Sequence, residues 1–161
     1  MAEPELILTI GVYGKSFEAF FGALKEAGVD TFCDIRLRRG IRGSQYAFVN
    51  SKRLQAELAR RHITYRYVPE LAPTQRIREL QHDADSEAGI TKRTREELGE
   101  VFKREYEKEI LDQFDGSRFR EFLAGSHKVV FFCVEGAPGA CHRSLVASRL
   151  GSIWNVPVEH L

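Results

Sequence analysis

The sequence contains few cysteines and no long hydrophobic run. Its three cysteines, at positions 33, 133 and 141 of 161, form an odd and sparse set, which does not describe the disulfide framework of a secreted protein. The longest apolar stretches are far too short to cross a bilayer. The N-terminal segment MAEPELILTIG lacks the basic stretch and the small-residue cleavage pattern of a secretory signal. We therefore expect a cytoplasmic protein with no membrane partner.

The chain as a whole has no large excess of positive or negative charge, although one segment is strongly basic. Lysine and arginine together number 24, aspartate and glutamate 23, and the net charge is +1. The hydrophobic fraction of 43% and the charged fraction of 29% are ordinary for a globular chain and argue against disorder. The length fits a single domain over residues 1–161. The segment RLRRGIRG, residues 36–43, holds four arginines and no acid, which predicts a local basic surface.

Hydrophobic patterns alternate between strand and helix along the chain. Ser16 and Gly28 fit the N-cap and the C-terminal stop of the first helix. Alternating strands and helices predict an α/β fold: one three-layer, Rossmann-like domain of about five mostly parallel strands, with helices on both faces. Strands are expected at residues 5–11, 29–36, 63–69, 128–134 and 156–161, and helices at 16–28, 51–62, 94–115, 117–125 and 141–154.

The segment 72–93 interrupts this pattern because it is polar and holds few large apolar residues. We expect a polar surface excursion with at most a short helix. Thr94 and Glu97 then match a capping box. They would open a long helix in which Leu98, Phe102, Tyr106 and Ile110 recur every fourth residue.

Parallel sheets bind ligands at the carboxyl ends of their strands, which directs attention to four loops. The first, GVYGKS at residues 11–16, has only two residues between its glycines, whereas a P-loop needs four. The amides at the start of the following helix, together with Lys15, could still hold an anion. The alternative is an ordinary strand-to-helix turn with a surface lysine.

The loop after the second strand opens with Asp34 and Arg36, which alternate and should point to one face. They form either a ligand-facing pair, an acid that orients an arginine toward an anion, or a structural salt bridge. The arginines that follow favour phosphates or nucleic acid. Farther along, Tyr46 and Phe48 could stack on bases or pack the loop onto the core, and Asn50 is a further candidate for substrate binding.

The segment CVEGAPGACHRS, residues 133–144, concentrates reactive side chains. Its spacing does not match a tyrosine-phosphatase loop, because nine residues separate Cys133 from Arg143. Zinc could be held by Cys133, Cys141, His142 and His160, but no C-x-x-C spacing supports a metal, and none is expected. The favoured interpretation is anion binding at a helix start.

In that interpretation the helix amides, His142, Arg143 and Ser144 bind an anion, while Glu135 acts as a general base or binds a ligand hydroxyl or amine. The alternative is structural. Glu135 and Arg143 would then be a bracing ion pair, and the cysteines would be small core residues.

Four segments resemble the signature blocks of the domain-of-unknown-function 488 family, in the same order and over nearly the whole chain: TIGVYGKSFEAF, DIRLRR, YRYVPEL and CVEGAPGACHRSLVA. The chain departs from the family pattern at Val12, where an aromatic residue or histidine is usual, and at Ala72, where a glycine is common. The resemblance implies an α/β fold and a shared polar site, and it supplies no established reaction. The site residues that it implies are Asp34, Arg36, Glu135, Cys141, His142 and Arg143.

The expected function is therefore action on a phosphate-bearing substrate, a nucleotide or nucleic acid, at an anion-binding site on the carboxyl edge of the sheet, with no cofactor. A non-catalytic nucleic-acid module using the arginine loop 36–43, and a thiol-based activity at Cys141, are the alternatives. The expected catalytic residues are Glu135, His142, Asp34 and Cys141. The expected substrate-binding residues are Arg36, Arg143, Ser144, Tyr13, Lys15 and Asn50.

Overall fold

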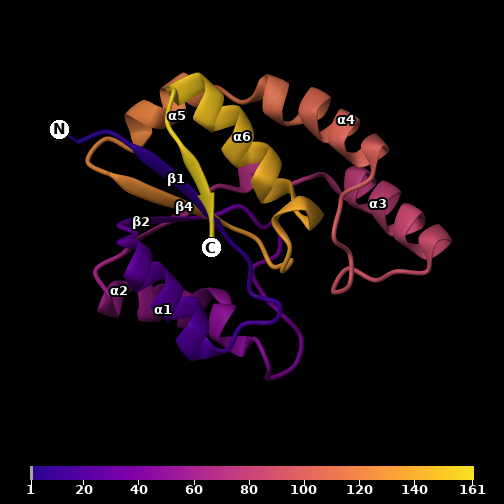
Figure 1. The fold of residues 1–161 in the computed structure, drawn as a ribbon, viewed down its shortest axis with the longest axis horizontal. Coiled ribbons are helices and arrows are strands. Elements are labelled where there is room, and N and C mark those ends of the chain that lie inside the picture. Colours follow the sequence, from indigo (N-terminus) through magenta and orange to yellow (C-terminus); the bar gives the residue numbers. More distant parts are fainter. Residues whose placement is uncertain (1) are drawn as a thin grey trace.

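A computed structural model describes residues 2–161, which form one five-stranded sheet with helices on both faces (Figure 1). The spatial order of the strands is β3-β2-β4-β1-β5, and every neighbouring pair is parallel. This confirms the predicted α/β three-layer architecture. The strands are β1 (Leu6–Ile10), β2 (Thr31–Asp34), β3 (Thr64–Tyr67), β4 (Lys128–Phe132) and β5 (Val158–His160).

The helices divide between the two faces of the sheet. In Figure 1, α1 and α2 lie on one side, α5 and α6 lie on the other, and α3 and α4 lie beside one another beyond α6. The chain also contains short 3₁₀ turns at Ala47–Val49, Pro69–Leu71, Leu111–Gln113 and Pro138–Ala140. The helices are α1 (Phe17–Ala27), α2 (Ser51–Arg60), α3 (Gln75–Ala88), α4 (Glu100–Glu109), α5 (Gly116–Phe122) and α6 (His142–Trp154).

The core lies on both faces of the central strands β4 and β1. Residues 129–132 and 7–10 are fully buried, as expected for strands that have a strand on either side and helices above and below. On the α1 side, the ring of Phe20 packs against those of Phe32, Phe48 and Phe132 at centroid distances of 5.5 to 6.3 Å. This aromatic cluster fixes the ends of β2 and β4, from which the loops described below emerge.

The caps of α1 follow the sequence prediction. The Ser16 side chain accepts a hydrogen bond from the Ala19 amide, and Gly28 ends the helix in the left-handed conformation with φ of 72°. Glycine is favoured there because it has no Cβ to clash at positive φ.

The predicted capping box at Thr94 and Glu97 is wrong. Helix α4 begins at Glu100 with Gly99 as its N-cap, and Thr94 instead forms a turn with Thr91. Leu98 precedes the helix but is buried. Its hydrophobic side chain therefore continues the four-residue spacing of Phe102 and Tyr106, although Leu98 is not part of the helix. The long helix expected up to residue 115 ends at Glu109, and a 3₁₀ turn follows.

The segment 72–93 is more ordered than its polarity suggests. Residues 75–88 form the fourteen-residue helix α3, longer than the short helix expected. The buried face of α3 carries Ile77, Gln81 and Asp85, one every fourth residue. Two of these three are polar, and for that reason the hydrophobic pattern does not reveal the helix.

The strand order places a topological switch point between β1 and β4. The chain leaves β1 through α1 toward β2, and it leaves β4 through α6 on the opposite face toward β5. The loops after these adjacent strands therefore diverge and leave a crevice at the carboxyl edge of the sheet, which is where open α/β sheets bind ligands.

Candidate functional site

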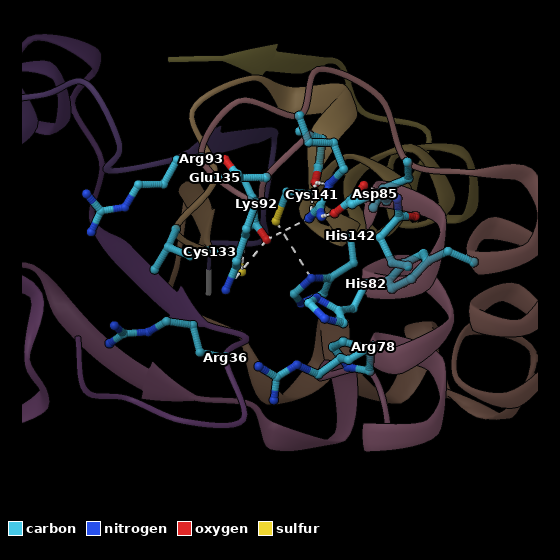
Figure 2. A pocket seen from close by; sticks show the side chains of 18 of the residues that line it. Arg36, Arg78, His82, Asp85, Lys92, Arg93, Cys133, Glu135, Cys141 and His142 are labelled. Atoms are coloured by element: carbon cyan, nitrogen blue, oxygen red, sulfur yellow. Dashed lines mark hydrogen bonds and ion pairs between the residues drawn. The ribbon is translucent and has the colours of Figure 1, made fainter. Parts of the chain in front are cut away.

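A cavity of about 870 Å³ opens at this edge of the sheet (Figure 2). Its wall is built by the loops after β1, β2 and β4, by α3, and by the segment 90–95 that follows α3. Five of the predicted site residues line it together: Tyr13, Arg36, Glu135, Cys141 and His142. The volume lies within the range of small-molecule sites.

The base of the cavity is a compact group of four buried side chains, Cys133, Glu135, Cys141 and His142. The Cys133 thiol donates to Glu135 Oε2 at 3.3 Å, and Cys141 Sγ lies 3.6 Å from His142 Nδ1. Dashed lines mark both contacts in Figure 2. Cys133 belongs to the hydrophobic core, as expected, and its thiol also contacts this polar group.

Hydrogen bonding fixes the orientation of the His142 ring. Its Nε2 lies 3.0 Å from the carbonyl oxygen of Ile35, at the end of β2. A carbonyl can only accept, so Nε2 carries the hydrogen and donates it, and Nδ1 of the neutral ring is left with a free lone pair. The edge of the ring that bears this lone pair faces Cys141.

Burial and close packing shift the pKa values of this group. Burial, with a smaller contribution from Cys133, raises the pKa of Glu135, and Lys92 and His142 only partly offset this. The contact with Cys141, together with burial, raises the pKa of Cys133 to about 12. For His142, burial by itself lowers the pKa, but Cys133, Glu135 and the Ile35 carbonyl outweigh burial and raise it. The shifts therefore favour the protonated forms of Cys133, Glu135 and His142.

Arg95 connects this group to α3. Arg95 is not among the site residues predicted from the sequence. Its guanidinium lies 3.1 Å from Glu135 Oε1 and 2.5 Å from Asp85 Oδ2. It also donates to the carbonyl of Ala140. Asp85 in turn accepts from Gln81, whose amide oxygen accepts from the Gly99 backbone. The buried polar face of α3 thus closes one side of the cavity.

The remaining wall is strongly basic. Seven lysine or arginine side chains line the cavity against three carboxylates, those of Glu79, Asp85 and Glu135. Within residues 2–161, four of the arginines pair with no carboxylate. These four, which we call the unpaired arginines, are Arg38, Arg42, Arg78 and Arg93.

The Asp34–Arg36 pair has the character of a structural salt bridge. Both side chains are buried, and the two are joined by bonds of 2.8 Å from Arg36 Nε and Nη2 to the two carboxylate oxygens. Asp34 also accepts from the Tyr65 hydroxyl, while Arg36 Nη2 donates to the Val49 carbonyl. Arg36 Nη1 is buried with no partner among the described residues, and Arg36 as a residue borders the cavity.

Arg143 and Ser144 lie outside the cavity wall. The Arg143 guanidinium is fully buried and donates to the backbone carbonyls of Glu135 and Gly136, and the Ser144 hydroxyl donates to the Cys141 carbonyl. Arg143 therefore braces the loop after β4 from within and does not converge with Arg36 on a common anion. The structural alternative, an ion pair between Glu135 and Arg143, is replaced by a contact of Arg143 with the Glu135 backbone carbonyl.

Lys15 and Asn50 also lie outside the cavity wall. The Gly14 amide, in the loop before α1, donates to the Tyr46 hydroxyl. Burial, with the charge of Arg143, lowers the pKa of Lys15. Asn50 Oδ1 accepts from the Ile41 amide and so shapes the arginine loop.

Tyr46 and Phe48 are buried and pack on the core, which is the second of the two alternatives that their sequence left open. The Tyr46 ring packs against Tyr13 at 5.4 Å, and the Arg93 guanidinium lies 5.1 Å from the centre of the Tyr13 ring. The aromatic residues thus support Arg93 at the cavity rim.

Comparison with known proteins gives one match. The family model described as "Domain of unknown function DUF488" matches residues 16–150. No curated protein and no solved structure shows a significant match. In the described chain, no helix has the length and apolarity needed to cross a membrane. Since the family model covers most of the chain, including the loops after β2 and β4 that build the cavity, the protein belongs to the DUF488 family.

Proposed function

We propose that the cavity binds a phosphate-bearing ligand of nucleotide size. The observation that carries this proposal is the set of unpaired arginines, which line the cavity without a carboxylate partner in residues 2–161. Arginines that a structure does not neutralise, gathered around a concave site, attract and orient phosphate groups through paired N–H donors.

The base of the cavity supports chemistry on such a ligand. Glu135 is buried, its pKa is raised, and it borders the cavity below the basic wall. A carboxyl group with a raised pKa is suited to proton transfer near neutral pH. We therefore propose Glu135 as the general acid or base, with the unpaired arginines as the substrate-binding groups.

Calorimetric titration with inorganic pyrophosphate, a nucleoside triphosphate and a short single-stranded oligonucleotide tests the proposal. The variants Arg38→Gln and Arg78→Gln should each weaken binding by about tenfold or more, since each removes a charge-assisted hydrogen bond. Arg76→Gln is the matched control, because Arg76 also lies on α3 but pairs with Glu105 and Glu109. Binding that is absent for all three probes, or equal in Arg78→Gln and the wild type, contradicts the proposal.

A nucleic-acid backbone is the second candidate ligand, and the exposed arginine loop favours it. Arg38 and Arg42 are exposed, as is the neighbouring Leu37. If a nucleic acid is the ligand, the affinity for the oligonucleotide should exceed that for the triphosphate and fall steeply with salt. A shallow salt dependence would instead indicate a small-molecule ligand.

A further inference from the structure

The buried sulfur and nitrogen atoms at the base of the cavity carry an inference that goes beyond anion binding. Cys133 Sγ, Cys141 Sγ and a ring nitrogen of His142 all lie within 4.8 Å of one another. Two thiols and an imidazole at such spacing are the donor set of zinc sites in proteins. The described structure offers one such cluster of three potential metal ligands.

The distances suit one shared ion. Tetrahedral zinc with Zn–S of about 2.3 Å and Zn–N of about 2.0–2.1 Å separates a sulfur and a nitrogen ligand by about 3.5–3.6 Å. Cys141 Sγ and His142 Nδ1 are 3.6 Å apart. The chain therefore holds these two atoms at the separation expected for two ligands of one zinc ion, although the two residues are consecutive in sequence.

The hydrogen bond made by the other ring nitrogen of His142 is also of the kind that metal-binding histidines make. His142 donates Nε2–H to the Ile35 carbonyl at 3.0 Å, so that Nδ1 presents its lone pair to the sulfur side. Metal-binding histidines almost always donate their other ring N–H to a carbonyl or carboxylate. Glu135 is likewise held from outside by Arg95 on Oε1, while its Oε2 lies 3.3 Å from Cys133 Sγ.

Charge balance favours a divalent cation at this depth. Cys133, Cys141 and His142 are all nearly inaccessible to solvent, and an uncompensated buried charge is costly. A dipositive ion that displaces both thiol protons to solvent leaves a neutral unit of two thiolates, one imidazole and one metal ion. Binding of the ion is therefore compatible with burial.

We propose that Cys133, Cys141 and His142 bind a thiophilic divalent cation, with Zn²⁺ the ion that this donor set fits best. All three residues line the cavity, so the bound ion borders it. Three protein ligands leave a fourth position for water, for substrate or for Glu135 Oε2, as in catalytic rather than structural zinc sites. The proposal gives Cys141 and His142 the role of ligands, in place of the thiol chemistry expected for Cys141 and the acid–base role expected for His142.

The sequence did not predict this site because spacing alone argues against it. Seven residues separate Cys133 from Cys141, with no C-x-x-C motif. The fourth ligand considered, His160, is on β5, where its Nδ1 lies 2.6 Å from Thr9 Oγ1 on β1, and it is outside the cluster. The donors meet because the loop after β4 folds back on itself before α6, and the sequence pattern does not show this.

Titration of reduced, chelator-treated protein with Co²⁺ tests the proposal. We expect one equivalent to bind with thiolate-to-cobalt charge-transfer bands and visible bands of tetrahedral cobalt, and Zn²⁺ to displace it. Cys133→Ser, Cys141→Ser and His142→Gln should each bind at least about a hundredfold more weakly, because loss of an outer-shell partner alone costs up to that much. Cys33→Ser is the matched control, since Cys33 is equally buried but outside the cluster.

Cobalt binding without thiolate bands, or equal binding by Cys33→Ser and Cys133→Ser, overturns the proposal. X-ray absorption of the zinc-loaded wild type needs no variant, so misfolding of a variant cannot affect the result. Two sulfur ligands at about 2.3 Å from zinc support the site, and their absence refutes it. Arg78→Gln should bind Co²⁺ like the wild type. Failure of anion binding and failure of metal binding are therefore distinguishable.

Discussion

Arg95 Nη2 lies 3.1 Å from Glu135 Oε1, and this contact joins two segments that are forty residues apart in the chain. The same guanidinium reaches Asp85 on α3 and the Ala140 carbonyl before α6. One buried arginine thus connects α3, the loop after β4 and the start of α6. The relative placement of the basic wall and the base of the cavity depends on it.

Replacing Arg95 should destabilise the protein severely. Arg95→Gln leaves the buried carboxylate of Asp85 without its cation and leaves that of Glu135 with only the more distant Lys92, 3.8 Å away. Breaking a buried pair in this way costs about 3–5 kcal/mol. Urea denaturation followed by circular dichroism measures this loss.

Arg149→Gln is the matched control for this change. Arg149 also bridges two carboxylates, those of Glu107 and Asp112, but at the surface. Its loss should cost less than about 1 kcal/mol. Equal losses in the two variants would show that the Arg95 network contributes no more than a surface ion pair.

Most of the fold could be predicted because strands and amphipathic helices leave periodic hydrophobic patterns. Residues 129–132 form a continuous apolar run, and such a run between flanking helices indicates a central parallel strand. Helix α3 could not be predicted in this way, since Gln81 and Asp85 occupy its buried face. Their partners, Gly99 and Arg95, come from a later segment, and local sequence does not specify a partner that only tertiary packing supplies.

The sequence could predict which loops line the cavity but not which side chains on these loops face it. The rule that ligands bind at strand ends selects the segments of Arg36, Glu135, Cys141 and His142, and the cavity contains all four. The same rule gives no information on side-chain direction. Arg143, at the second position of α6, turns inward to two backbone carbonyls. Arg78 and Arg93, which face the cavity, come from a segment that the rule does not select.

Gly11 should not tolerate a side chain. A Cβ at this position would stand 1.9 Å from the Glu135 carbonyl oxygen, so the loop after β4 must move in Gly11→Ala. We expect a destabilisation of about 1–3 kcal/mol, as for other overpacked interior sites, measured by denaturation. Gly22→Ala is the control: it has open space around it on α1, and it should stabilise the helix by about 0.5–1 kcal/mol. Equal stability of Gly11→Ala and the wild type would contradict the close approach.

Arg143→Gln should lose stability while it retains anion binding. The change removes charge-assisted bonds to the carbonyls of Glu135 and Gly136, and each such bond contributes about 1.5–3 kcal/mol. The unpaired arginines are left in place, so pyrophosphate should still bind at temperatures where the variant is folded. Denaturation and calorimetry measure the two effects separately. A stable variant that no longer binds pyrophosphate would show that Arg143 contacts the anion, as the sequence first indicated.

His160 should make the protein less stable as the pH falls through the range of histidine titration. Although His160 is exposed as a residue, partial burial of its ring and the charge of Arg143 lower its pKa in the folded chain below the ordinary value of 6.5. The unfolded chain therefore binds this proton more readily than the folded chain does, and stability must fall as pH drops from about 7 to about 5.5. In His160→Gln, which can still bond to Thr9, this part of the pH dependence should disappear. NMR titration of the imidazole checks the cause directly. A midpoint at or above 6.5, or an unchanged pH dependence in the variant, would refute the assignment.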